Sequence, residues 1–397
     1  MGHRGKREYL KAIYARYHRS SKTDKRLILD EFCKVTGYHR KSALRLLHGP
    51  QPERSPRKRR PRTMTYLPAT LEVLTSIWTA ANHPWSVRLK ALLPLWLPWA
   101  TQRFDLTPFI QKQILSISPR QMDRLLAPRK SSLKKRLYGR TKPGSLLKHH
   151  IPLRLDRWNV STPGFTEIDL VSHSGECADG EFINSLNVTD IHSTWVETRA
   201  VLGKSQVRVQ FALDDIRNVL PFRLLGIDSD NGSEFINDHL FRYCKSLQIQ
   251  FTRGRPYKKD DNAHIEQKNW THVRKLLGYV RYDSTDALAA INDLYRNEVR
   301  LLQNLFLPSV KLLSKTRVGS KLRRVYDTPQ TPLDRVIASP GADVKKVAAL
   351  KALRTRIDPF ELSTTVDRKL EHIYTLAHHR HSPHALRAAQ SSRTVTS

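Results

Sequence analysis

Three acidic residues stand where a metal-binding site would need them: Asp169, Asp230 and Glu266. Asp169 lies inside the β-like run Thr166–Ser172, and Asp230 follows the β-like run Leu224–Asp228. Glu266 falls in the first turn of an expected helix. There are 60 residues between the first and second acids and 35 between the second and third. Three carboxylates presented by two strands and one helix predict a site for hard divalent cations.

The chemistry that such a site supports is phosphoryl transfer. Exchange of a phosphodiester bond needs charge stabilisation on the attacking and the leaving oxygen, and two Mg²⁺ ions about 3.5–4 Å apart supply it. We expect Asp169 to bridge the two ions and Asp230 to bind from the end of the adjacent strand. Glu266 is expected to complete the coordination of the second ion. Asn231 and Gly232 favour a sharp turn directly after Asp230. The sequence therefore predicts an enzyme that cuts and joins DNA strands.

Each of these acids has a competitor nearby in the chain. Asp260 and Asp261 precede Glu266, and one of them is expected to cap its helix. Asp228 shares a strand face with Asp230 but is not followed by the Asn-Gly turn. Glu167 shares a face with Asp169 but stands nearer to the start of its strand. A single acid of this kind is more often a solvated surface carboxylate, so the prediction depends on the combination of contexts and spacing.

The charge of the chain is distributed unevenly. The formal net charge is +33, of which residues 1–65 carry +14, residues 66–159 carry +12 and residues 286–397 carry +9. Residues 160–285, which contain the three acids, carry −2. An excess of cations around a near-neutral block predicts a polyanionic partner, and double-stranded DNA fits this distribution.

Residues 1–49 predict a helix-turn-helix domain, with helices at Lys25–Thr36 and His39–Leu47 joined by a turn at Gly37. One face of the first helix is expected to be buried: Leu27, Ile28, Phe32 and Val35. The inward side chains of the second helix are expected to be Ala43, Leu46 and Leu47. Its outward cations suit a major groove: Arg40, Lys41 and Arg45. The alternative is a small helical bundle with a solvated basic face.

A basic, proline-rich linker follows at residues 50–65. It cannot bury a core, so we expect it to lie along a phosphate backbone or in a minor groove. The alternative is a plain flexible tether. Its expected DNA contacts are four consecutive cations: Arg57, Lys58, Arg59 and Arg60.

Residues 66–128 predict a second helical domain that contains another helix-turn-helix pattern. We expect a helix at Ala69–Ala81 and then a hydrophobic helical region, Trp85–Trp99, which proline interrupts. The two helices of the second pattern are predicted at Thr107–Leu115 and Pro119–Leu126, with Ser118 as the N-cap of the latter. A second basic linker covers residues 129–159.

Residues 160–285 predict an α/β domain with a mixed five-stranded sheet flanked by helices. The hydrophobic pattern has the order β-β-β-α-β-α-β-α. The expected strands are Thr166–Ser172, Ser185–Thr189, Ser193–Val201, Leu224–Asp228 and Ile249–Arg253. The expected helices are Val207–Leu220, Glu234–Leu247 and Asn262–Tyr279.

Residues 286–397 form a basic C-terminal region. Val310–Tyr326 alternates basic and apolar residues, which predicts a strand pair or an extended arm that grips DNA. Helices are expected at Val344–Arg356 and Ser363–Ala377, and a frayed tail after them.

Residues 160–285 resemble the catalytic core of the DDE recombinases, the superfamily of retroviral integrases and bacterial insertion-sequence transposases. The signature Asp-Asn-Gly-x-x-Phe stands at Asp230–Phe235, and Asn-Ala-x-x-Glu stands at Asn262–Glu266. The resemblance implies a ribonuclease-H-like fold with Asp169, Asp230 and Glu266 as ligands of two Mg²⁺ ions, which Mn²⁺ can replace. It also implies binding of terminal inverted repeats, cleavage at the ends of a mobile element, transfer of the 3′-OH to target DNA, and an assembly of at least two protomers on DNA.

The chain departs from the superfamily pattern in two places. It lacks the His-His-Cys-Cys zinc region found at the start of retroviral integrases. Trp270 and Val273 stand where basic residues often follow the third acid. Expected DNA contacts near this helix come instead from four lysines: Lys258, Lys259, Lys268 and Lys275.

Two other kinds of protein share some of these features. A DNA-binding regulator derived from a transposase would have lost the chemistry, although it would have no need to keep three acids. A ribonuclease-H-like nuclease would share the core but not the paired helix-turn-helix patterns. With no signal peptide and no apolar run long enough for a bilayer, we expect a cytoplasmic, nucleoid-associated protein.

Overall fold

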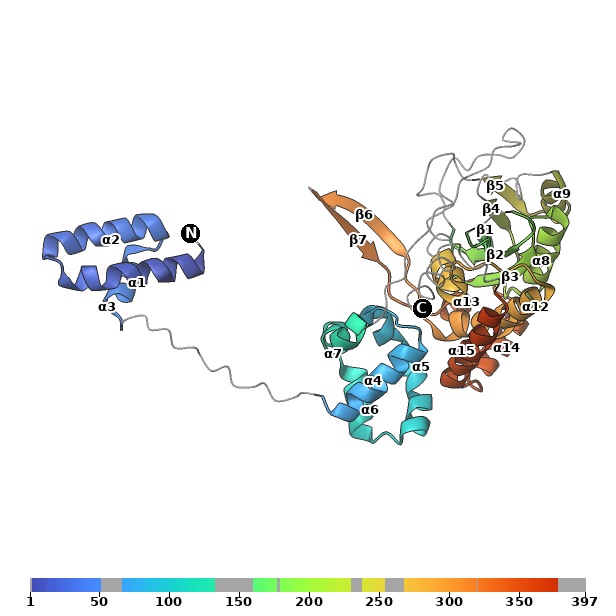
Figure 1. The fold of residues 1–397 in the computed structure, drawn as a ribbon, viewed down its shortest axis with the longest axis horizontal. Coiled ribbons are helices and arrows are strands. Elements are labelled where there is room, and N and C mark those ends of the chain that lie inside the picture. The colour runs from blue at the N-terminus through green and yellow to red at the C-terminus, as the bar shows by residue number, and fades with distance from the viewer. Residues whose placement is uncertain are drawn as a thin grey trace, which may run out of the picture. The chain divides into compact units, whose positions relative to one another are not determined.

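The computed structural model describes seven stretches of the chain: residues 2–50, 66–132, 160–176, 179–229, 238–253, 268–318 and 320–377. It divides into two compact units, Met1–Thr65 and Tyr66–Ser397. Figure 1 draws the elements of both units.

The first unit is a three-helix domain, formed by α1 (His3–Arg19), α2 (Lys22–Thr36) and α3 (Arg40–His48). Gly37 ends α2 in the left-handed conformation, with φ of 69°, which glycine adopts without steric cost. The turn from α2 to α3 is therefore three residues long, a length typical of a helix-turn-helix. The core side chains are Leu10, Ile13, Tyr17, Ile28, Leu29, Phe32, Ala43 and Leu47.

Three of the side chains predicted to be buried in this unit are exposed, so that part of the prediction was wrong. Leu27 is 67% exposed, Val35 is 42% exposed and Leu46 is 37% exposed. The buried face of α2 lies instead around Leu29 and Phe32, because α1 packs against that side. The packing of α1 therefore decides which face of α2 is buried, and this face could not be predicted from the sequence patterns of α2 and α3 alone.

The second unit begins with four helices: α4 (Pro68–Ala80), α5 (Ser86–Phe104), α6 (Pro108–Ser116) and α7 (Pro119–Ser132). The expected interruption of the second helix by proline was wrong, since α5 runs through Pro94 and Pro98. A proline inside a helix costs about 3 kcal/mol. Burial of the opposite face outweighs this cost, and Trp96 on that face is fully buried. The predicted N-cap of α7 is confirmed: Ser118 Oγ accepts from the backbone N–H of Gln121 at 3.3 Å.

The predicted mixed five-stranded sheet flanked by helices is confirmed. Its strands are β1 (Phe165–Ser172), β2 (Ile183–Asp190), β3 (Val196–Leu202), β4 (Gly226–Ser229) and β5 (Gln250–Arg253). Their spatial order is β3-β2-β1-β4-β5, in which β2 is antiparallel to both of its neighbours, while β4 is parallel to β1 and β5 is parallel to β4. Helices α8 (Gln206–Val219) and α9 (Asp238–Ser246) connect the parallel strands.

The described part of the helix that follows β5 comprises η1 (Asn269–Arg274), a π-helical segment, and α11 (Lys275–Leu277). It leads to α12 (Thr285–Leu294) and two further π-helical segments, η2 (Tyr295–Val299) and η3 (Leu302–Phe306). Two asparagines on this helical stretch satisfy the edge of β3: Asn292 exchanges two hydrogen bonds of 2.9 Å with the backbone of Ala200. Asn304 does the same with Val196, at 3.0 and 2.8 Å. These amides cover an edge that would otherwise offer open pairing positions.

The remaining elements are a hairpin and three helices. The predicted strand pair is confirmed as β6 (Leu312–Val318) and β7 (Lys321–Tyr326), which extend away from the sheet as a two-stranded ribbon (Figure 1). The helices are α13 (Pro332–Ile337), α14 (Val344–Arg354) and α15 (Pro359–Thr375).

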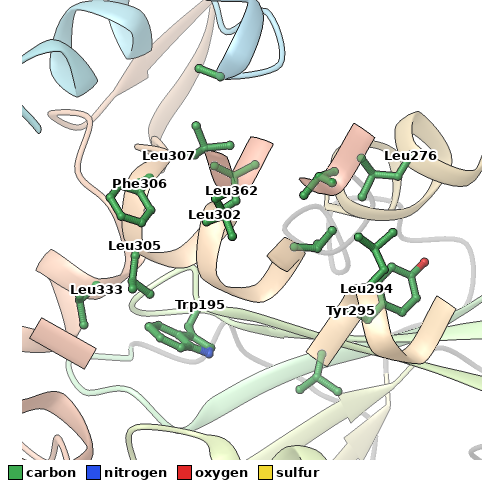
Figure 2. Close-up of a cluster of buried hydrophobic side chains, with 14 of the residues drawn as sticks. Trp195, Leu276, Leu294, Tyr295, Leu302, Leu305, Phe306, Leu307, Leu333 and Leu362 are labelled. Carbon is green, nitrogen blue, oxygen red and sulfur yellow. The ribbon is translucent and has the colours of Figure 1, made fainter. Parts of the chain in front are cut away.

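One hydrophobic core joins the segments of the second unit. Figure 2 shows Trp195, which precedes β3, close to Leu305 and Leu333, with side chains of α15 and η3 nearby. The helices before the sheet join the same core, because Trp96 of α5 donates from Nε1 to the carbonyl of Phe306 at 3.2 Å. Among the described residues, no helix is long and apolar enough to cross a membrane.

Candidate active site

Asp169 lies in the middle of β1, the central strand of the sheet. Its neighbours Ile168 and Leu170 point into the hydrophobic core, which fixes the opposite direction for Asp169 because side chains alternate along a strand. The Asp169 side chain is half-buried, so its carboxylate is held by the protein but still reaches the surface.

Two asparagines orient this carboxylate. Asn269, the first residue of η1, donates from Nδ2 to Oδ2 of Asp169, and Asn187 of β2 donates from Nδ2 to Oδ1 of Asn269 at 2.8 Å. The other carboxylate oxygen, Oδ1, accepts from the backbone N–H of Leu170 at 2.8 Å. These bonds fix the orientation of the Asp169 carboxylate.

The other two predicted acids, Asp230 and Glu266, lie outside the described residues. The described chain approaches both of them. Strand β4 ends at Ser229, one residue before Asp230, and Ser229 is the parallel register partner of Ile168. Asn269, which contacts Asp169, stands three positions after Glu266.

The acids that compete with Asp169 and Asp230 as metal ligands are buried in the sheet, whereas those that precede Glu266 lie outside the described residues. Glu167 and Asp228 are each 1% exposed, and they are register partners on adjacent strands. Asp228 accepts a hydrogen bond from Thr252 Oγ1 at 2.6 Å. Neither carboxylate presents itself at the surface as Asp169 does.

A second group of polar side chains surrounds Ser185 of β2, which pairs with Val171, two residues after Asp169. His173 Nε2 and Tyr295 Oη each lie 2.8 Å from Ser185 Oγ, which forms a buried chain of three polar groups. Burial, with a smaller effect from Arg274, lowers the pKa of His173 to about 3, so the ring is neutral at physiological pH. The Arg274 guanidinium lies 4.6 Å from the centroid of the Tyr279 ring. Burial lowers the pKa of Arg274, while the charge of Asp169 acts in the opposite direction.

The structure places the predicted DNA-contacting cations in different settings. On α3, Lys41 and Arg45 are exposed, and Arg40 is paired with Asp30 of α2. Lys268 is half-buried and donates from Nζ to the carbonyl of Thr194 at 3.5 Å. Burial, with smaller effects from Arg88 and Arg335, lowers the pKa of Lys268 to about 7. Lys275 is also half-buried and donates to the carbonyl of Asn82. The other predicted contacts lie outside the described residues: Arg57, Lys58, Arg59, Arg60, Lys258 and Lys259.

Sequence reasoning missed Asn269 and Asn187. A signal for Asn269 was present, because a residue three positions after Glu266 shares its face if the helix is continuous. The signal for Asn187 was the register of the first hairpin, in which Asn187 pairs with Asp169. Within the described stretches, no three His, Cys, Asp or Glu side chains converge closely enough to hold a metal ion.

Comparison with known proteins gives one extensive sequence match. No family model matches the chain. The structure of the HTLV-2 integrase catalytic core domain in complex with magnesium (dimeric form) is 16% identical, with a TM-score of 0.28, over 37% of this chain and 91% of that one. The catalytic core domain of BIV integrase is 17% identical, with a TM-score of 0.27, over 43% of this chain and 91% of that one.

The sequence match is much more extensive than these two structural likenesses. "Uncharacterized protein y4rM" of Sinorhizobium fredii (strain NBRC 101917 / NGR234) is 39% identical over 331 residues, which cover 83% of this chain and 94% of the relative. Identity of this extent over nearly the whole relative shows common descent. The chain belongs to the family of the Sinorhizobium fredii protein y4rM.

Proposed function

We propose that this chain is a DDE-type transposase, a metal-dependent polynucleotidyl transferase that cuts DNA at the ends of a mobile element and joins them to target DNA. The observation that carries the proposal is the convergence on Asp169 of the two chain segments that lead to Asp230 and Glu266. The first segment is β4, which pairs with β1 and ends one residue before Asp230. The second is η1, whose first residue, Asn269, hydrogen-bonds to Asp169.

Covalent geometry limits how far Asp230 and Glu266 can lie from these two segments. Adjacent Cα atoms are about 3.8 Å apart across a trans peptide, so Asp230 follows immediately from the end of β4. Three residues of chain reach at most about 11 Å. Both connections are short, and they support the proposal that three acids separated by 60 and 35 residues in the sequence act at one site.

The surroundings of Asp169 suit a hard cation. A half-buried carboxylate with an amide donor on one oxygen and a backbone donor on the other is a pre-oriented oxygen ligand. Asp169, Asp230 and Glu266 would hold two Mg²⁺ ions, with Mn²⁺ as a substitute, and the ions would stabilise charge on the attacking and leaving oxygens. The buried positions of Glu167 and Asp228 support Asp169 as the ligand from this part of the sheet.

The partner that we assign to this activity is double-stranded DNA. We assign its recognition to the α2–α3 pair, the α6–α7 pair and the basic segments 50–65 and 129–159. The β6–β7 hairpin adds a further basic surface, on which Arg317, Arg323 and Arg324 are exposed. Cations of this kind bind the phosphates of a duplex. At least two protomers would act together, because two element ends must be held at once.

The test uses the full chain, Mg²⁺ and DNA fragments that carry the inverted repeats flanking its gene. We expect end cleavage and strand-transfer products from the wild type. Asp169→Asn and Asp230→Asn should lose both, by at least about 10³-fold if a ligand contributes several kcal/mol to the transition state. Asp286→Asn, at an exposed carboxylate in the first turn of α12, is the matched control and should keep wild-type activity.

Two other results would overturn the proposal. Specific binding to the repeats without any nicking by the wild type would identify a regulator that has lost its chemistry. Nicking without strand transfer, on DNA with or without the repeats, would identify a ribonuclease-H-like nuclease.

A further inference from the structure

A cavity of about 330 Å³ adjoins the η1 segment. Three aromatic side chains line it: Trp85 from the start of α5, Trp270 from η1 and Tyr326 from the end of β7. Trp85 is 45% exposed and Tyr326 is 41% exposed, although both are large aromatic residues. Their rings meet edge to face, with centroids 6.0 Å apart and an interplanar angle of 75°.

The wall opposite η1 is a tight turn between α4 and α5. Asn82 and His83 both have positive φ, at 60° and 59°. Non-glycine residues adopt this conformation at a cost, and such residues gather at functional sites. The turn is braced by Trp78, whose Nε1 donates to the carbonyl of Pro84 at 3.1 Å. Lys275, after η1, donates to the carbonyl of Asn82 and so links the two walls.

The cavity combines aromatic rings with cations. Arg88 and Lys275 line it together with the three rings. Arg88 uses its Nε to donate to the carbonyl of Pro308, and a guanidinium has further donors on its two terminal nitrogens. Aromatic rings bind the faces of nucleobases, and cations bind the adjoining phosphates. A volume near 300 Å³ is at the small end of ligand pockets.

We propose that this aromatic pocket, defined by Trp85, Trp270 and Tyr326, binds a single unpaired base of the DNA end being processed. A base inside a duplex has both faces covered by its neighbours, so only an unpaired or extruded base presents a face to these rings. The position of the pocket supports this occupant. Trp270 directly follows Asn269, the residue that contacts Asp169, so a base held against Trp270 lies close to Asp169. This inference rests on the proposed function.

The test measures base binding separately from chemistry. The probes are a short duplex with a single-stranded overhang that contains 2-aminopurine, and the same duplex with a blunt end. With Ca²⁺ in place of Mg²⁺, the wild type should quench the overhang fluorescence and prefer the overhang by about tenfold, the scale of one stacked base. Trp85→Ala and Tyr326→Ala should lose quenching and preference but keep blunt-duplex binding.

The matched control is Phe211→Ala, which removes an aromatic ring that is 70% exposed on α8 and does not line the pocket. It should behave as the wild type does. Trp85→Phe keeps a ring and should retain most of the preference, which separates loss of stacking from loss of folding. Asp169→Asn should retain quenching, because the pocket does not need the catalytic acid.

The outcomes distinguish the two proposals. If the wild type cleaves and joins DNA, and Trp85→Ala and Tyr326→Ala keep its overhang preference, the base-binding proposal is wrong while the transposase proposal stands. If the overhang preference depends on Trp85 but the chain neither cleaves nor joins DNA, the transposase proposal is wrong while the base-binding proposal stands. Displacement of the overhang by dAMP as readily as by unlabelled overhang DNA would also overturn the inference, since the pocket would then be a mononucleotide site.

Discussion

The Nδ2 group of Asn269 donates a hydrogen bond to Oδ2 of Asp169, across a separation of 100 residues in the chain. This bond joins the middle of the central strand to the helix that follows the third predicted acid. Asn187 completes the link by donating to Asn269 from the neighbouring strand. The orientation of the proposed metal ligand is therefore set by two neutral side chains that have no role in the acid motif.

Removal of this link should weaken metal binding without unfolding the protein. We expect Asn269→Ala to lower activity about 10- to 100-fold, the range for groups that orient a metal ligand. The loss should be partly recovered at higher Mg²⁺, because the variant leaves Asp169 present but less well oriented. The measurement is DNA cleavage as a function of Mg²⁺ concentration.

Asn297→Ala is the control for this variant. Asn297 is exposed on η2, and its side-chain amide donates to the carbonyl and to Oδ1 of Asp293, one helical turn earlier. An unchanged Mg²⁺ dependence in Asn269→Ala would show that the asparagine does not position Asp169.

A buried ion cluster on β3 should contribute strongly to stability. Glu197 is fully buried and bonds Arg300 at 2.7 Å, Arg199 at 3.3 Å and the Trp195 indole at 2.9 Å. Glu197→Ala removes the carboxylate that the buried Arg199 and the partly buried Arg300 share, and leaves Arg300 without this partner. We expect it to lower the free energy of unfolding by about 3–5 kcal/mol in urea titrations.

The matched exposed pair is Glu181 with Arg208, at 3.2 Å and with both side chains about half exposed or more. Glu181→Ala should cost less than about 1 kcal/mol. Equal effects of the two substitutions would contradict a structural role for the Glu197 cluster.

The stability of the fold should fall at acidic pH because of His173. Its pKa is about 3 in the folded chain against an ordinary value of 6.5, so the unfolded chain binds more protons between these pH values. Stability contributed in this way is complete above pH 6.5 and is lost as pH falls towards 3. The slope should be about 1.4 kcal/mol per pH unit for one such group.

His173→Gln removes this titration, so its unfolding free energy should depend less on pH than that of the wild type between pH 6 and pH 4. Glutamine keeps a polar group for Ser185. His272, which is also buried, is unchanged in both proteins, so its contribution cancels in the comparison. Parallel pH profiles for the two proteins would show that His173 is not held neutral in the fold.

The hairpin should supply phosphate contacts. Residues 312–326 contain no acid, and three described cations of the hairpin are exposed: Arg317, Arg323 and Arg324. Each lost phosphate contact lowers the slope of log affinity against log salt by about 0.9. Replacement of the three arginines by glutamine should therefore reduce the slope by up to about 3. Fluorescence anisotropy with a duplex at several salt concentrations gives this slope.

The control for the hairpin variant carries three substitutions to glutamine at exposed cations on or after α14: Lys345, Lys351 and Arg356. Both triple variants change the net charge equally. A similar loss of slope in both would mean that the hairpin has no specific contact with the duplex.

Much of the fold followed from local patterns. The order of strands and helices in 160–285 was predictable because period-2 and period-3.6 patterns depend on neighbours in the chain. The strand pair at 312–326 and the N-cap at Ser118 followed from the same kind of local chemistry. The three acids were identified by their motifs and spacing, and their assignment as metal ligands stays a prediction.

Tertiary structure decided what depends on distant contacts. It kept α5 continuous through two prolines, because partners from other segments bury its far face. It turned Leu27 outward because α1 covers the other side of α2. It bonded Lys268 to the carbonyl of Thr194, whereas Arg317 stands exposed on a hairpin. The sequence by itself determined which residues are able to bind metal, phosphate and base. Only packing between segments far apart in the chain decided which of them meet, because burial and hydrogen bonding between such segments do not exist until the chain has folded.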